Sequence, residues 1–210
     1  MKKARILDDI MQSDIARMEE TLRFIDRDAF KNSVETILKA KKIYIIGIRS
    51  CAPLAEFLHF YMNLICDNVV LVTTNNPSEV FEQMIHINEK DVVIGISFPR
   101  YSMCTLKALE FASNQKAKII TLTNSVHSPI NLYSSCNLLA KSEMVSVVDS
   151  LVAPLSVINA LISALYMKKN DEVLERLEML DQVWSDYQVY SSDELNQIEE
   201  SVEIIEKEEA

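Results

Sequence analysis

Short apolar runs alternate with longer amphipathic segments along most of the 210-residue chain. The runs are rich in Ile and Val and are almost uninterrupted, which is typical of strands buried on both faces of a parallel sheet. Strands are predicted at 43–47, 68–72, 91–96 and 118–123, with a weaker one at 137–140. Segments with helical spacing follow them, at 51–65, 77–87, 103–113 and 151–167. The alternation predicts an α/β fold: a doubly wound, parallel sheet of about five strands with helices on both faces.

Both ends of the chain have helical periodicity without strands. Two amphipathic helices are predicted within residues 1–40, and a further helix at 171–190. We therefore divide the chain into a helical lead-in at 1–40, an α/β domain at 41–170, and a C-terminal helix with an acidic tail at 171–210. The apolar faces of the lead-in helices fit packing on their own domain or on a partner subunit, and the pattern does not separate these two arrangements.

Polar turns follow three of the predicted strands, at 47–50, 97–102 and 123–128. The carboxyl ends of parallel strands open on one edge of a sheet, which is where ligands bind in such folds. The turn at 97–102 carries two hydroxyls and an Arg, and it leads into the helix predicted from Met103. A helix N-terminus offers free N–H groups and a positive dipole end, so this arrangement favours a phosphate group.

Charge and composition exclude several classes of function. The formal net charge is −10, of which residues 191–210 carry −7, so no part of the chain offers the basic footprint of a nucleic-acid-binding surface. No apolar run is long enough to span a bilayer, and the first residues lack the apolar core of a secretion signal. The four cysteines and three histidines are scattered without ligand spacing. We predict a cytoplasmic protein without disulfides, metal or cofactor.

Four short stretches together resemble a known family. They are Gly47-Ile48-Arg49-Ser50, Ser97-Phe98-Pro99-Arg100-Tyr101-Ser102, Ser128-Pro129 and Asp149-Ser150-Leu151-Val152-Ala153-Pro154-Leu155. The combination resembles the sugar isomerase (SIS) domain, in the form found in the RpiR family of bacterial transcription regulators. The resemblance implies the same doubly wound sheet, binding of a phosphorylated sugar, and assembly into dimers or higher oligomers.

The resemblance also assigns roles to residues. It matches Ser50 to the hydroxyl of the first phosphate loop, and Ser97 and Ser102 to the first and last hydroxyls of the Ser-x-Ser-Gly-x-Thr loop of many SIS proteins. This chain has Pro99 where that loop has its middle Ser, and Arg100 where it has Gly. Because Pro has no N–H or hydroxyl to donate, Arg100 or Arg49 is expected to replace the lost phosphate contact.

The predicted ligand-binding residues come from the three turns and from the start of the helix at 151–167. They are Gly47, Arg49, Ser50, Ser97, Phe98, Pro99, Arg100, Tyr101, Ser102, Thr123, Asn124, Ser128, Asp149 and Ser150. Each also has a purely structural interpretation. Ser102 and the pair Asp149 and Ser150 are typical helix N-caps, and polar residues after a strand commonly only form a loop.

Regulators of this kind carry a helix-turn-helix domain ahead of the SIS domain, and no basic recognition helix precedes the first strand here. The leading hypothesis is a phosphosugar-binding effector domain that controls sugar-metabolism genes through an attached DNA-binding domain absent from this chain, with a stand-alone SIS protein left open. The first alternative is a sugar-phosphate aldose–ketose isomerase, which needs an acid or base such as Glu143 or His127. The second is a purely structural dimerisation module.

Overall fold

The computed structural model describes residues 5–74, 76–143 and 148–189 of the chain. The chain divides into two compact units, Met1–Lys168 and Lys169–Ala210. The first unit contains the sheet and every predicted site residue. In the second unit, the described residues form helix α7, Asn170–Asp186. The acidic tail at 191–210 lies outside the described residues.

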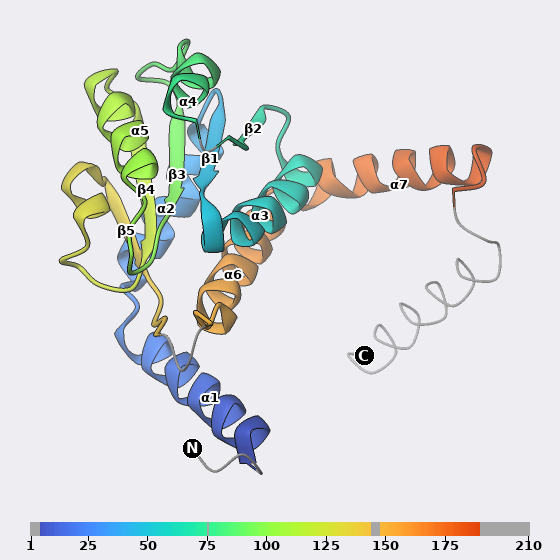
Figure 1. Cartoon of the computed structure of the whole chain (residues 1–210). Helices are drawn as coiled ribbons and strands as arrows, with labels where there is room; N and C mark the ends of the chain where they lie inside the picture. The colour runs from blue at the N-terminus through green and yellow to red at the C-terminus, as the bar shows by residue number, and fades with distance from the viewer. Residues whose placement is uncertain (1–4, 75, 144–147, 190–210) are drawn as a thin grey trace. The chain divides into compact units, whose positions relative to one another are not determined.

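The sheet has five parallel strands in the order β2-β1-β3-β4-β5 (Figure 1). The predicted α/β fold is therefore confirmed. The register pairs Ile43 with Val69 on one side of β1 and with Val92 on the other. The strands are β1 (Ile43–Gly47), β2 (Val69–Val72), β3 (Val92–Ile96), β4 (Lys118–Thr123) and β5 (Cys136–Leu139).

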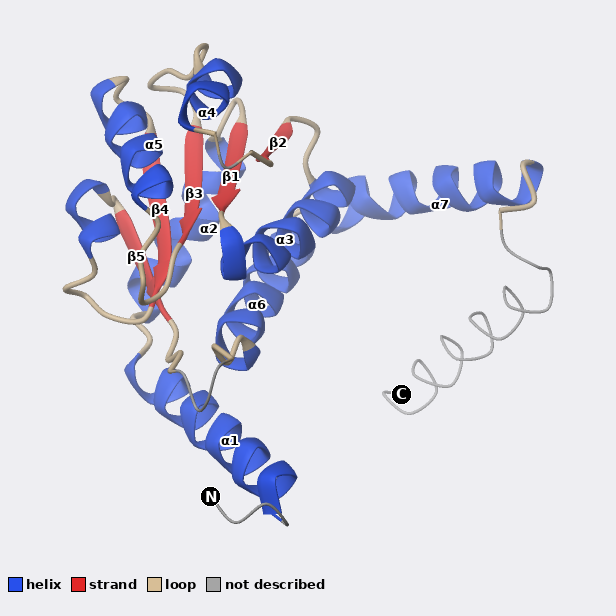
Figure 2. Ribbon diagram, viewed as in Figure 1, coloured by secondary structure: helices blue, strands red, loops and turns tan. Residues whose placement is uncertain are grey.

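Helices cover both faces of the sheet (Figure 2). On one face, α2 contacts β5 and α6, while α3 contacts β1, β2 and α6; on the other face, α4 and α5 pack together, and α5 covers β3 and β4. Helix α1 packs on α6, so the lead-in contacts its own domain. The helices are α1 (Ile6–Phe24), α2 (Arg27–Lys39), α3 (Ala52–Ile65), α4 (Pro77–Met84), α5 (Met103–Asn114) and α6 (Val152–Lys168).

The core explains why the strands are apolar without interruption. All residues of β1 and β3 are buried, because each strand has a neighbour on both sides and helices on both faces. Tyr44, Ile46 and Val93 pack against Leu109 of α5 and Met84 of α4 in one cluster. Each fully buried aliphatic side chain of this size contributes about 1.5–3 kcal/mol to folding.

The topology leaves an opening between the ends of β1 and β3. From β1 the chain proceeds through α3 to β2 at the edge, then crosses back through α4 to β3 on the other side of β1. The connections therefore leave β1 and β3 in opposite directions, and ligands bind at such a reversal in doubly wound sheets. The predicted turns at 47–50 and 97–102 follow these two strands.

One local prediction is wrong. Asp149 and Ser150 do not cap the helix that follows them, because α6 begins only at Val152. Their side chains bond elsewhere: Asp149 accepts from Arg100 at 2.8 Å, and Ser150 donates to Asp14 of α1 at 2.6 Å. The side chains that the local pattern assigns to a helix cap thus form hydrogen bonds with residues far away in the sequence.

Candidate functional site

A pocket of 440 Å³ lies at the carboxyl ends of β1 and β3. Its lining comes from the two turns that follow these strands and from the first turns of the helices beyond them. The lining residues are Ile48, Arg49, Ser50, Cys51, Ser97, Phe98, Pro99, Arg100 and Ser102. Seven of the predicted site residues are thus brought together in one cavity, and Ile48 and Cys51 join them.

Ser97 and Ser102 have structural partners that leave their donor capacity free. The Ser97 hydroxyl oxygen accepts the backbone N–H of Ser102 at 3.3 Å, and the Ser102 hydroxyl accepts that of Thr105 at 3.3 Å. A hydroxyl that accepts one bond still has a hydrogen to donate. Because both side chains line the pocket, closing the turn and donating to a ligand are compatible roles.

The two arginines have an unusual backbone conformation. Arg49 has a φ of 61° and Arg100 a φ of 68°, in the left-handed region where Gly is normally favoured. The resemblance places Gly where Arg100 stands, and this chain has a cation at that position. A non-Gly residue in this region costs of order 1–3 kcal/mol, and such strain is typical of functional sites.

Helix N-termini and cations make the pocket suited to an anion. Helix α5 begins at Met103, directly after Ser102, and α3 begins at Ala52 after a single 3-10 turn, Arg49–Cys51. Each helix start has N–H groups without intrahelical partners and the positive end of a dipole. A phosphate group in the pocket would meet these N–H groups, the serine hydroxyls and the arginines.

Cys51 forms an apolar part of the pocket wall. Only 5% of its surface is exposed. Burial, with a smaller contribution from the negative charge of Asp149, raises the pKa of the Cys51 thiol above its usual value. Burial thus disfavours the thiolate, which is the nucleophilic form of cysteine. Its position next to Ser50 was the one signal in the sequence for its place in the lining.

The other predicted residues do not line this pocket. Gly47 lines a smaller neighbouring pocket of 170 Å³ that shares Arg49. The Tyr101 hydroxyl donates to the Asn124 side chain at 2.8 Å and so ties the turn after β3 to the turn after β4. Thr123 and Ser128 are buried, and their hydroxyl oxygens have no hydrogen-bond partner among the described residues.

The acid–base candidates are less well placed. The Glu143 side chain is 75% exposed and lies 3.8 Å from the Arg17 guanidinium. His127 is exposed on the loop after β4. Neither lines the 440 Å³ pocket. Within residues 5–74, 76–143 and 148–189, no group of three His, Cys, Asp or Glu side chains could hold a metal ion. No helix in this part of the chain is long and apolar enough to cross a bilayer.

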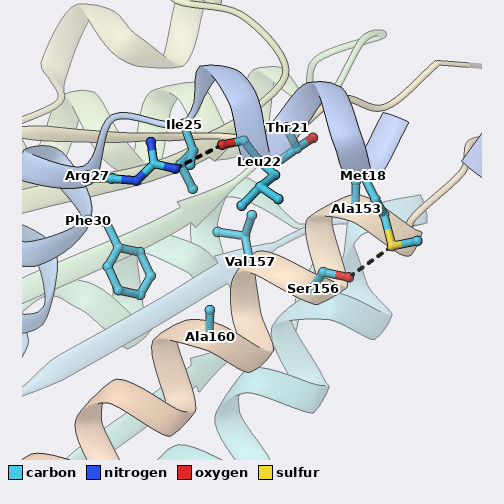
Figure 3. A pocket seen from close by; sticks show the side chains of 10 residues that line it. All are labelled: Met18, Thr21, Leu22, Ile25, Arg27, Phe30, Ala153, Ser156, Val157 and Ala160. Atoms are coloured by element: carbon cyan, nitrogen blue, oxygen red, sulfur yellow. Dashed lines mark hydrogen bonds between the residues drawn. The ribbon is translucent and has the colours of Figure 1, made fainter. Parts of the chain in front are cut away.

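An apolar pocket of 260 Å³ lies between α1, the start of α2 and α6 (Figure 3). Leu22 and Met18 of α1 face Val157 of α6 across it, with Phe30 of α2 at one end. Leu22 is 67% exposed, so the face of α1 toward this pocket is only partly covered by its own domain.

Comparison with known proteins points to one family. The model of the SIS domain matches residues 36–164, which include both turns of the pocket. An uncharacterised HTH-type transcriptional regulator from Haemophilus influenzae is 28% identical over 125 residues, covering 59% of this chain and 43% of the regulator. The chain thus spans less than half the length of this relative.

Solved structures agree with the fold. The sugar isomerase domain of an RpiR transcription factor from Sphaerobacter thermophilus has a TM-score of 0.81 at 24% identity, over 85% of this chain and 99% of that one. Vibrio vulnificus NanR, solved with ManNAc-6P, has a TM-score of 0.77 at 18% identity, over 91% of this chain and 72% of NanR. Phosphoheptose isomerase from Neisseria gonorrhoeae has a TM-score of 0.65 at 16% identity, over 76% of this chain and 97% of the isomerase. The fold is therefore shared by regulators and by isomerases.

Proposed function

Because the chain belongs to the SIS domain family, we propose that it is the phosphosugar-binding effector domain of a transcription regulator. One observation carries the proposal: the 440 Å³ pocket gathers serine hydroxyls and two arginines at the ends of β1 and β3, beside two helix N-termini. This combination suits a phosphate dianion. The pocket volume falls within the range usual for small-molecule sites, about 300–1,000 Å³.

In this proposal the phosphate lies over the start of α5. Ser50, Ser97 and Ser102 donate their hydroxyl hydrogens to it, and Arg49 and Arg100 supply charge. Pro99 donates nothing, so the cation at Arg100 offsets the hydroxyl that this turn lacks. Tyr101 and Asn124 lie at the side of the site and hold the turns in place.

The regulatory part of the proposal is supported by relatives. The Haemophilus relative is named as an HTH-type regulator, and NanR was solved with a sugar phosphate. We propose that this domain likewise controls sugar-metabolism genes through an attached DNA-binding domain. A ligand achieves this only if it binds one arrangement of the protein better than another.

A sugar-phosphate isomerase is the second candidate, favoured by the similarity of the fold to phosphoheptose isomerase. It ranks lower because Glu143 and His127 lie on exposed positions and outside the pocket lining. Isomerisation needs an acid or base within hydrogen-bond reach of the sugar carbons that exchange hydrogen.

A thermal-shift screen against sugar phosphates and the matching unphosphorylated sugars tests the proposal. A ligand present at a hundred times its Kd stabilises the native state by about 2.7 kcal/mol. We expect a shift with one phosphorylated sugar and none with its parent sugar. Turnover of that sugar phosphate would instead favour the isomerase, and a flat panel would favour a dimerisation module.

The double substitution of Ser97 and Ser102 by Ala tests the site itself. We expect the affinity for the sugar phosphate found in the screen to fall at least about a hundredfold, since two donors to a charged group are lost, each contributing about 1.5–3 kcal/mol. Cys136→Ala, on the distant strand β5, is the matched control. Unchanged affinity in the double variant would refute the site assignment.

Self-association is the third part of the proposal. Helix α1 exposes large apolar side chains along its length, and only Thr21 of this helix is buried. We propose that a second copy of the chain covers the face that runs from α1 to the apolar pocket against α6. The exposed apolar residues of α1 are Ile6, Leu7, Met11, Ile15, Leu22 and Phe24.

A further inference from the structure

A chain of polar contacts runs from the pocket to helix α1. It begins at Arg100, whose guanidinium is 2.8 Å from the Asp149 carboxylate. It continues through the next residue, Ser150, whose hydroxyl donates to Asp14 of α1 at 2.6 Å. Arg100 and Asp149 are 49 positions apart in the sequence, and Asp14 and Ser150 are 136 positions apart. Nothing in the phosphosugar proposal requires this connection.

The two ends of the ion pair differ in their surroundings. The Arg100 side chain is 66% exposed and can turn toward the pocket that it lines, whereas the Asp149 side chain is only 14% exposed. The Asp149 carboxylate makes no other side-chain hydrogen bond among the described residues. Its negative charge reaches the pocket, because it adds to the effect of burial in raising the pKa of Cys51.

Helix α1 also has polar contacts with two residues that follow β5. Lys141 and Glu143 hold α1 at three further described points. The backbone N–H of Lys141 donates to Thr21 at 2.9 Å, and the Lys141 ammonium group lies 2.8 Å from Glu20. Glu143 lies 3.8 Å from Arg17. Only one residue of α1 is buried, so apolar packing contributes little to its position and these polar contacts contribute more.

We propose that Asp149 competes with the ligand's phosphate for Arg100, and that phosphate binding thereby loosens the contact of the neighbouring Ser150 with α1. The inference rests on the phosphosugar site proposed above and assigns it a regulatory output. Without ligand, Arg100 pairs with Asp149. With ligand, Arg100 turns to the phosphate, which repels the Asp149 carboxylate, and the Ser150–Asp14 contact is weakened.

Energetic coupling makes the effect reciprocal. If phosphate binding weakens the Asp149 contact, then loss of that contact strengthens phosphate binding by the same factor. The element with two arrangements is the Arg100 side chain, which both sites bias. Helix α1 lies at the N-terminal side of the domain, so its release is a movement that an attached domain could sense.

Asp149→Asn tests the competition directly. Inorganic phosphate is titrated into wild type and variant by calorimetry at constant ionic strength. Removal of a competing ion pair and of a like charge should tighten binding about fivefold. Glu89→Gln removes the same charge from an exposed position before β3, at the opposite edge of the sheet, and should leave the affinity unchanged.

Hydrogen–deuterium exchange of the α1 amides tests the output. Saturating phosphate should speed exchange in α1 several-fold in wild type, and Arg100→Gln should show the fast exchange without phosphate. Ser150→Ala should show α1 already in fast exchange without phosphate and, by the same reciprocity, should bind phosphate more tightly than wild type. Because these variants alter exposed or half-buried side chains, the sheet amides are an internal control for folding.

The outcomes separate the two proposals. Equal phosphate affinity in wild type and Asp149→Asn would overturn the coupling and leave the site intact. An exchange rate of the α1 amides that does not change when phosphate is added would do the same. Failure of every variant and of wild type to bind phosphate would overturn the site and the coupling together.

Discussion

Ser102 shows how one side chain serves the fold and the ligand. Its oxygen caps α5 by accepting the Thr105 N–H, while its hydroxyl hydrogen is free on the pocket side. From the sequence alone, capping and ligand binding are alternative roles for Ser102, because a serine directly before a helix is suited to either role. The structure makes them compatible, since the two roles use different atoms of the hydroxyl.

Two substitutions at Ser102 separate these roles. Ser102→Ala removes the cap and should lower the free energy of unfolding by about 1 kcal/mol. Ser102→Asp keeps an acceptor for the Thr105 N–H and should stay within about 0.5 kcal/mol of wild type, but its charge should abolish sugar-phosphate binding by repulsion. Urea denaturation and calorimetry measure the two effects. Binding by the Asp variant would contradict a phosphate at this position.

Gly47 marks a close approach of backbone at the end of β1. A Cβ added there would lie 2.8 Å from the Cys51 carbonyl oxygen and 3.0 Å from the Ala55 Cβ. Gly47→Ala should therefore cost about 1–3 kcal/mol of stability and displace the turn that lines the pocket. Gly95→Ala should cost less, because the added Cβ meets the methyl ends of Leu109, which can rotate. Equal losses in urea denaturation would contradict the argument.

At the scale of elements, the end of α5 is held by a Schellman motif. The Ala117 N–H donates to the Ala112 carbonyl at 3.1 Å, and the Lys116 N–H to that of Ser113 at 2.9 Å. Lys116 has the left-handed φ of 63° that this motif requires. A lysine occupies a position where Gly is preferred, so the helix ends by geometry and without the usual sequence signal.

The same substitution should have opposite effects at two positions of α5. Lys116→Gly removes left-handed strain and should raise the free energy of unfolding by about 0.5–1 kcal/mol. Lys107→Gly, on the exposed face within the helix, should lower it by about 1 kcal/mol. Thermal or urea denaturation compares them. A loss of stability at Lys116 would show that the motif does not set the end of the helix.

At the scale of the whole molecule, α1 has more large exposed apolar side chains than any other element that the structure describes. It contacts α6 but leaves six large apolar side chains exposed. Exposed apolar patches of this kind mark interaction sites in monomeric domains. The proposed second copy would bury them, as the resemblance to an oligomeric family implies.

Leu22→Arg tests this assembly. Leu22 is 67% exposed, so the substitution should leave the folded chain intact within about 0.5 kcal/mol, yet it places a charge in the proposed interface. We expect a shift from dimer to monomer in light scattering after size exclusion. Leu132→Arg changes a leucine that is 77% exposed on the short helix after β4 and should not alter the mass. A dimer that survives Leu22→Arg would place the interface elsewhere.

The pattern of apolar runs was enough to predict the sheet, because a strand between two helical layers must be apolar on both faces. The pattern also predicted which turns lie at the same edge of the sheet, because the carboxyl ends of parallel strands meet there. Arg49 and Arg100 were therefore predicted to be neighbours although 51 positions separate them. The resemblance to the SIS domain came from the same turns, and the family model confirms it.

Tertiary structure alone decided the partners of each polar group. Asp149 and Ser150 read as a helix cap, yet they bond to Arg100 and to Asp14, and no local signal gives contacts between segments so distant in the chain. Periodicity showed that α1 has an apolar face but not which body covers it, because burial depends on the packed neighbours. Local sequence therefore sets elements and turns, whereas long-range contacts decide which charges meet at the site.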